Sequence, residues 1–243
     1  MDNIKTLSEL FDLYSKTHGN ECHTEDTFPR HPKTKAYPDD PEAFKTSFCW
    51  DGVTSITGGV DQKNVEPKIK VLFILKESNN GGIATPYEDK VFWFNDKPKV
   101  PARIRYQEKL SLVLDILDVN TKANFGYMNL NKRGGFGSTT YRQLKQYVLN
   151  YKSFIKRQIE LHDPEYIVFC GCYYMFASLI FKDEFRLQSV PVKWPHKPVE
   201  INLNGHTTKL LHVYHPAYSR FKESLKYLEN NRSYINSWRG AFK

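Results

Sequence analysis

The chain has 243 residues, 40% of them hydrophobic and 14% aromatic, which is enough for a packed core and excludes an intrinsically disordered protein. The formal net charge of +8 favours a polyanionic partner, although many basic proteins bind no nucleic acid. The longest apolar runs are too short to span a bilayer, so we expect a cytoplasmic protein without a membrane partner.

The four cysteines, Cys22, Cys49, Cys170 and Cys172, are too few for a disulfide framework and contain no CxxC pair. Cys170 and Cys172 stand two residues apart in a strand-like segment, so we interpret them as buried small apolar residues rather than ligands.

The domain organisation follows from the absence of a proline-rich or serine-rich linker in the sequence, which predicts one domain over residues 1–243. Residues 1–67 are expected to form a helix and loop-rich extension packed on its core. Within this extension, residues 4–16 carry apolar side chains at helical spacing. The following stretch is rich in Pro, Asp, Thr and Gly, which is typical of surface loops with short elements.

From residue 71 onward, candidate strands and helices alternate. The expected strands are VLFIL at 71–75, FGYMNL at 125–130, YIVFCG at 166–171 and LLHVYH at 210–215. Helices are expected at 102–119, 141–162, about 174–181 and the C-terminus, with a β-like stretch at 192–209. This alternation predicts an α/β fold, a three-layer α/β/α sandwich with a central, mainly parallel four-stranded sheet.

Polar residues and glycines follow these strands, at the edge of the sheet where ligands bind in open α/β folds. KESNNGG follows the first strand, NLNKRGG ends the second, Cys170 and Gly171 end the third, and HPAYSR closes the fourth. The sequence therefore predicts a binding site at the carboxyl ends of the strands.

In this order, the motifs KESNNGG, MNLNKRGG, PEYIVFCG and HPAYSR resemble those of the uracil-DNA glycosylase superfamily over roughly residues 68–225. The resemblance implies an enzyme that flips a nucleotide out of DNA and hydrolyses the bond between deoxyribose and a damaged or modified pyrimidine. It implies water as the nucleophile, and hence an abasic site without strand cleavage. The cysteine spacing does not match the iron–sulfur branch of the family, so we expect no metal cluster and no cofactor.

The sequence leaves two bases as candidate substrates. The uracil-removing branch carries Asp-Pro-Tyr in the first motif, where the tyrosine helps to exclude thymine, and this chain has Glu77, Ser78 and Asn79 instead. Uracil and a bulkier phage base such as glucosylated hydroxymethylcytosine are therefore both candidates. Members of the superfamily that remove such phage bases serve antiviral defence, and the sequence does not separate defence from repair.

Two residues are predicted to be catalytic. Glu77 supplies the carboxylate that a cationic sugar transition state requires, although its position fits a surface glutamate beside Lys76 equally well. His215 precedes Pro216 and would donate a hydrogen bond from a neutral imidazole to an oxygen of the departing base. The alternative for His215 is a histidine whose ring is satisfied by backbone in a tight turn.

Four residues are predicted to bind the flipped base. Asn129 carries both a donor and an acceptor for reading a pyrimidine edge, unless it caps a turn, and Asn79 would supplement it. Phe92 and Phe94, with Trp93 between them, are candidate stacking surfaces, and at least one of the three is expected in the core.

Contacts to the DNA backbone and groove are predicted from three motifs. The residues are Lys76, Asn80, Gly81, Lys132, Arg133, Gly134, Tyr218, Ser219 and Arg220. Residues 132–138 would form either a basic, glycine-rich loop near phosphates or a mobile solvated loop. The HPAYSR motif resembles the loop by which the family enters the minor groove, where Tyr218 and Arg220 would occupy the space left by the flipped nucleotide.

Two other functions remain open. The first is a non-catalytic DNA-binding protein with the same fold, which would account for the net positive charge. The second is a glycosidase for free nucleosides, in which the basic motifs would have no role. The sequence contains no motif of phosphate-loop NTPases, dinucleotide enzymes, zinc proteases or zinc deaminases. We expect a monomer.

Overall fold

The computed structural model describes residues 1–20, 48, 52–54, 69–79, 101–119, 125–135, 140–182 and 198–237. Within these ranges only the backbone is described at 19–20, 52–54, 77–79, 101–105, 107, 134–135 and 173–175. Every helix in the described ranges is too short or too polar to cross a lipid bilayer.

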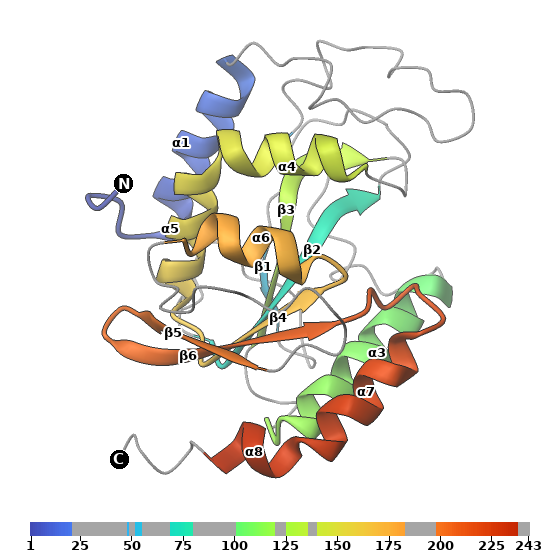
Figure 1. The fold of residues 1–243 in the computed structure, drawn as a ribbon. Helices are drawn as coiled ribbons and strands as arrows, with labels where there is room; N and C mark the ends of the chain where they lie inside the picture. The colour runs from blue at the N-terminus through green and yellow to red at the C-terminus, as the bar shows by residue number, and fades with distance from the viewer. Residues whose placement is uncertain are drawn as a thin grey trace.

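The described residues form one six-stranded sheet, in the order β1-β3-β2-β4-β6-β5 (Figure 1). Its strands are β1 (Gly52–Thr54), β2 (Val71–Asn79), β3 (Phe125–Gly135), β4 (Tyr166–Cys170), β5 (Val199–Leu203) and β6 (His206–Val213). The four central strands are parallel, whereas β1 and β5 pair antiparallel at the two edges. The predicted α/β sandwich is confirmed, and the sheet is two strands wider than the predicted four.

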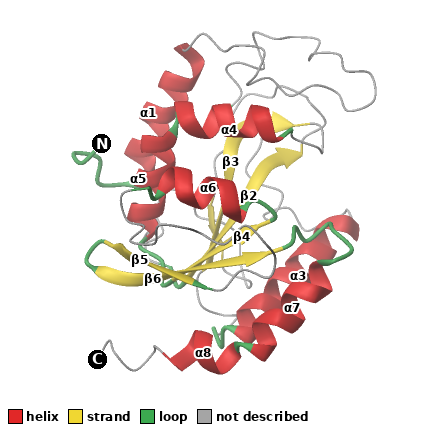
Figure 2. Ribbon diagram, viewed as in Figure 1, coloured by secondary structure: helices red, strands yellow, loops and turns green. Residues whose placement is uncertain are grey.

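Helices cover both faces of the sheet (Figure 2). One face carries α1 (Leu7–Asn20), α4 (Tyr141–Asn150), α5 (Lys152–His162) and α6 (Tyr173–Ile180). The other face carries α3 (Pro101–Ile116), α7 (Phe221–Asn230) and α8 (Arg232–Asn236). The central strands therefore bury both faces, which explains why VLFIL and YIVFC read as continuous apolar runs.

Successive side chains of β2 enter two different cores. Leu72 and Ile74 pack in the core under α1, α4, α5 and α6, and Val71, Phe73 and Leu75 pack in the core under α3 and α7. Whether a residue of β2 has an even or an odd number therefore indicates which of the two layers of helices its side chain faces.

Two helix boundaries differ from the predicted ones for local reasons. The first helix begins at Leu7 rather than at residue 4, because Thr6 and Glu9 form a capping box in which each side chain accepts a backbone N–H of the other. The predicted helix 141–162 is divided at Tyr151, whose φ of −113° and ψ of 19° bend the backbone. Tyr151 is fully buried at this bend, where its ring packs against those of Tyr147 and Phe154.

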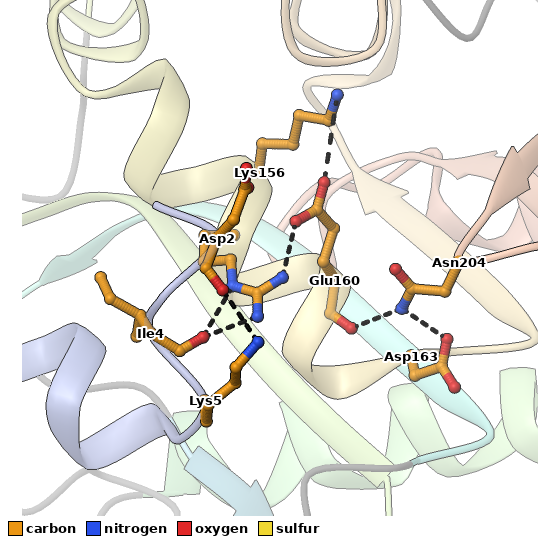
Figure 3. A network of polar contacts seen from close by, with 8 residues as sticks. Asp2, Ile4, Lys5, Lys156, Glu160, Asp163 and Asn204 are labelled. Atoms are coloured by element: carbon orange, nitrogen blue, oxygen red, sulfur yellow. Dashed lines mark hydrogen bonds and ion pairs between the residues drawn. The ribbon is translucent and has the colours of Figure 1, made fainter.

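Hydrogen bonds to charged side chains tie the N-terminus to α5 (Figure 3). The Arg157 guanidinium donates from Nε and Nη2 to the carbonyl of Ile4, at 3.1 and 2.6 Å, and from Nη1 to Glu160 at 3.1 Å. The carbonyl of Glu160 accepts from Asn204, which also donates to Asp163. One network thus joins the segment before α1, α5 and the β5–β6 turn at the end of the sheet away from the strands' carboxyl edge.

Arg157→Met is expected to lower the free energy of unfolding by ~1–2 kcal/mol, because the Ile4 carbonyl loses a charged donor. Urea denaturation measures the change. Lys145→Met, at an exposed position of α4, removes the same charge and is the control. Equal stability of the two variants would contradict the assigned role of this network.

Candidate functional site

The sheet divides at its carboxyl edge, between β2 and β4. The pairing of β2 with β4 ends at Ile74 and Phe169, whereas its pairing with β3 continues to Asn79 and Gly135. This strand split also marks the point where the strand order reverses, because the chain passes from β2 to β3 on one side and then to β4 on the other. In open α/β sheets ligands bind at such a point, so the strand split is the candidate site.

The polar residues after VLFIL continue the strand instead of ending it. We predicted a strand end at Leu75, but β2 runs to Asn79, because β3 supplies a pairing partner for the additional backbone. Glu77 pairs opposite Asn131, and the register then shifts so that Ser78 pairs with Gly134. The side chains of Glu77 and Asn79 lie outside the described atoms, so their catalytic and base-binding roles stay predictions.

Asn129 lies inside β3, not after it. The strand was predicted over 125–130 and extends to Gly135, and Asn129 pairs with Leu75 with 2% of its surface exposed. The alternative that Asn129 caps a turn is therefore wrong. By the alternation of the strand it shares a face with Tyr127, which packs in the core under α3 and α7.

The predicted basic loop is corrected by the structure. Lys132 and Arg133 belong to β3 and are fully buried, which excludes both the phosphate-binding loop and the solvated loop for this part of the motif. The Lys132 ammonium donates to the carbonyl of Asn129 at 2.8 Å, and the Arg133 guanidinium lies over the Tyr147 ring at 5.6 Å. Gly134 extends the strand, and residues 136–139 lie outside the described residues.

His215 follows β6, across the strand split from β2. Its Nδ1 accepts the N–H of Ala217 at 3.1 Å, and its carbonyl accepts the N–H of Tyr218 at 2.7 Å. Because Nδ1 is an acceptor, the proton of the neutral ring lies on Nε2. Tyr106 of α3 packs edge-on against the ring, with centroids 5.9 Å apart. The backbone thus satisfies one ring nitrogen and leaves Nε2–H as the donor for a ligand.

Close packing against β4 fixes the position of His215. Gly171 follows β4 directly and has a φ of +75°, and its N–H donates to the carbonyl of Val213 at 2.7 Å. A Cβ on Gly171 would lie 2.9 Å from the Cβ of His215, which is closer than real Cβ contacts. Only glycine therefore allows the histidine to lie this close to the end of β4.

The imidazole of His215 is held in its neutral form. Burial and, to a smaller extent, the positive charges of Lys76 and Lys109 together lower its pKa to about 4. Lys109 reaches the turn from α3, since its ammonium donates to the carbonyl of Pro216. His215 is thus an uncharged hydrogen-bond donor at any pH well above 4.

The turn after His215 presents predicted DNA-contact residues at the surface. Tyr218 is 50% exposed, and Ser219 and Arg220 are also exposed. The Arg220 guanidinium lies 4.8 Å from the Tyr214 ring centroid and makes two hydrogen bonds to Glu223, at 2.8 and 2.7 Å. Because this ion pair is exposed to water it is weak, so a phosphate can compete with Glu223 for Arg220.

The sequence interpretation missed Tyr106 and Lys109. Tyr106 and Lys109 extend the buried stripe of α3 that continues through Leu110 and Val113. A lysine on an otherwise apolar helical stripe was a signal that could have been read from the sequence. Gly171 was noted at its strand end, but only its positive φ shows why the residue is needed.

Several other predicted positions fall outside the described residues. These are Asn80, Gly81, Phe92, Trp93 and Phe94. In the part of the chain that is described, no group of three or more His, Cys, Asp or Glu side chains could hold a metal ion.

Cys170, the last residue of β4, and Cys172, which precedes α6, are buried, as predicted. Cys170 and Cys172 are buried and free, and burial raises the pKa of Cys172 to about 12 although Lys76 opposes the shift. The Cys172 thiol donates to the carbonyl of Ile74 at 3.7 Å, at the strand split.

Comparisons with known proteins assign no family. No protein-family model matches the chain, and no curated protein shows significant similarity to it.

Proposed function

We propose that the protein is a monofunctional DNA glycosylase that flips out and hydrolytically removes a modified or damaged pyrimidine, in the cytoplasm. The observation that carries the proposal is His215 beside the strand split, where burial and the charges of Lys76 and Lys109 lower the pKa of its ring and Nδ1 accepts the N–H of Ala217, so that Nε2–H is the donor. The order of the four motifs and their resemblance to uracil-DNA glycosylases support it. The net charge of +8 suits a DNA partner.

In the proposed reaction the bond between C1′ of the deoxyribose and the base nitrogen breaks, and its electron pair leaves with the base. His215 donates from Nε2 to a base oxygen as negative charge grows there, and a neutral imidazole does this without losing a proton. Water adds to C1′ and passes a proton to the carboxylate of Glu77, which also faces the developing sugar cation. The products are a free base and an abasic site, and the DNA strand stays intact.

Base recognition is assigned to residues on either side of the strand split. Neighbouring strands lie ~4.8 Å apart, so β3 and β6, with two strands between them, lie ~14 Å apart, a distance that a base and two side chains can bridge. Asn129 would read the pyrimidine edge from β3 while His215 contacts it from the end of β6. Tyr218, half exposed beside His215, would fill the space left in the duplex.

The test is release of the base from oligonucleotides that carry a single uracil, hydroxymethylcytosine or glucosylated hydroxymethylcytosine. We expect one of these to be converted to an abasic site that breaks only on heating in alkali. Glu77→Gln should slow release by ~10²-fold or more while DNA binding is retained. Glu200→Gln, at an exposed position of β5, is the matched control.

Other outcomes separate the remaining candidates. Tight, salt-sensitive DNA binding without release from any of the three oligonucleotides would favour a non-catalytic DNA-binding protein. Faster release from the corresponding free nucleosides than from DNA would favour a nucleoside glycosidase.

A further inference from the structure

A single peptide group connects Lys109 to His215. The carbonyl of Pro216 and the N–H of Ala217 belong to the same planar trans peptide, so they point in opposite directions. The Lys109 ammonium donates to that carbonyl, and the N–H donates to Nδ1 of His215 at 3.1 Å. A residue of α3 is therefore linked to the imidazole through one rigid unit.

The orientation of this peptide decides which ring nitrogen of His215 carries the proton. In the observed orientation the N–H of Ala217 faces Nδ1, which makes Nδ1 an acceptor and leaves the proton on Nε2. If the peptide were rotated, the carbonyl of Pro216 would face Nδ1 instead, and the ring could bond to it only with the proton on Nδ1. Nε2 would then have no hydrogen to donate to a ligand.

The turn that contains this peptide has two common forms. The N–H of Tyr218 donates to the carbonyl of His215 at 2.7 Å, which closes a β-turn with proline in the second position. The two usual types of such a turn differ by rotation of the central peptide, and the rotated type needs a positive φ in the third position. Ala217 is not among the described residues with a positive φ. The alanine thus favours the observed orientation, by an amount comparable to one hydrogen bond.

Lys109 adds a second and stronger bias to the same orientation. The residue is half-buried, and its ammonium lies 5.6 Å from the centroid of the ring of Phe221, the first residue of α7. Tyr106, one turn earlier on α3, packs against the imidazole itself. A hydrogen bond from a charged donor is stronger than one between neutral groups, and rotation of the peptide would break it. Lys109 therefore stabilises the orientation in which Nδ1 is an acceptor.

We propose that Lys109 is a positioning residue that selects the Nε2–H tautomer of His215 by holding the peptide between Pro216 and Ala217. The consequence for catalysis rests on the proposed glycosylase function, because the Nε2–H form is the one that donates to the departing base. The choice of tautomer itself needs no substrate, so it can be measured in the free protein.

The test determines the tautomer of His215 by NMR, on protein with isotope-labelled histidine nitrogens, at neutral pH and without DNA. His215→Ala identifies the signals of this ring. We expect the Nε2–H form in the wild type and a population of the Nδ1–H form that rises ~10-fold or more in Lys109→Met. Combining Lys109→Met with Ala217→Gly removes both biases and should raise that population further. Lys109→Arg, which keeps a charged donor, should restore the wild-type tautomer.

A control and a kinetic measurement accompany the NMR experiment. Lys222→Met, at an exposed position of α7, removes the same charge and should leave the tautomer unchanged. In base release, Lys109→Met should lower kcat by ~10-fold with little change in KM, because the loss falls on the donor used in the chemical step. Lys109→Arg should restore kcat.

The outcomes separate this inference from the proposed function. The Nε2–H form alone in Lys109→Met and in its combination with Ala217→Gly would overturn the role of Lys109, even if the protein releases a base. The Nδ1–H form in the wild type would overturn it as well. A mixture of tautomers in the Lys109→Met variants, but not in Lys222→Met, supports the inference even if no modified base is released.

Discussion

Replacing His215 with alanine is expected to slow base release by ~10²–10³-fold, because the transition state loses a preorganised donor to the oxygen on which charge develops. DNA binding should change little, since the loss falls on the chemical step. Single-turnover base release from the best substrate measures the effect. His206→Ala, a histidine at the other end of the sheet that pairs with Asp163, is the control.

The pH dependence identifies the form in which His215 acts. Its pKa in the folded chain is lowered to about 4 from 6.5. The rate of base release should therefore not change with pH around neutrality and should fall only near pH 4, where His215 becomes protonated. The unfolded chain binds the proton first as pH falls, so this histidine lowers stability progressively from about pH 6.5 to about pH 4. The alanine variant should lose less stability over that window. A rate that instead rises on protonation of His215 would contradict the neutral donor.

Gly171→Ala is the second substitution expected to have a large effect. Its φ of +75° disfavours any side chain, and its Cβ would approach the Cβ of His215 to 2.9 Å and the backbone nitrogen of His215 to 3.1 Å. We expect the free energy of unfolding to fall by ~2–4 kcal/mol, and base release to slow by ~10-fold or more as the histidine shifts. Thermal denaturation and the base-release assay measure the two effects.

Gly205→Ala separates the cost of a positive φ from the cost of the close contact with His215. Gly205 also has a positive φ, +86°, but a Cβ there would have no heavy atom within 4 Å. This variant should show only the cost of the backbone conformation, ~1–2 kcal/mol, with unchanged base release. If both glycine variants behave alike, the contact with His215 has no energetic importance.

The strands could be located from the sequence because they are buried on both faces. VLFIL, FGYMNL and YIVFC have few polar interruptions. The strand predicted over 210–215 is also present, but it runs from His206 to Val213, so His215 lies two residues beyond its end. The α/β layers follow from the alternation with helices. These features depend on local apolar patterns, which sequence reading detects well.

The strand ends could not be located in the same way. KESN and NKRGG contain residues typical of loops, yet they pair with each other and lengthen both strands. That pairing is a long-range property, because each polar segment is strand only in the presence of the other. The prediction of Arg133 in a surface loop was wrong for the same reason. A charged residue usually lies at the surface, but the Arg133 side chain lies over the ring of Tyr147 of α4, a contact that depends on how distant segments pack.

The site itself was only partly predictable. The turn at His215 is local and could be read, whereas the approach of Lys109 depends on how α3 packs beside α7. The β1 strand was also missed, since its three residues are strand only by pairing with β3.

The strand split also divides β2 by its local stability. Residues 71–74 have partner strands on both sides in the described sheet, so their amides exchange with solvent only when the sheet opens as a whole. Among the described strands, residues 75–79 pair with β3 alone, and this shorter ladder opens at a lower cost in free energy. A ligand that covers the free edge would raise that cost by its own binding energy. Binding would therefore slow amide exchange in residues 75–79 more than in the centre of the sheet.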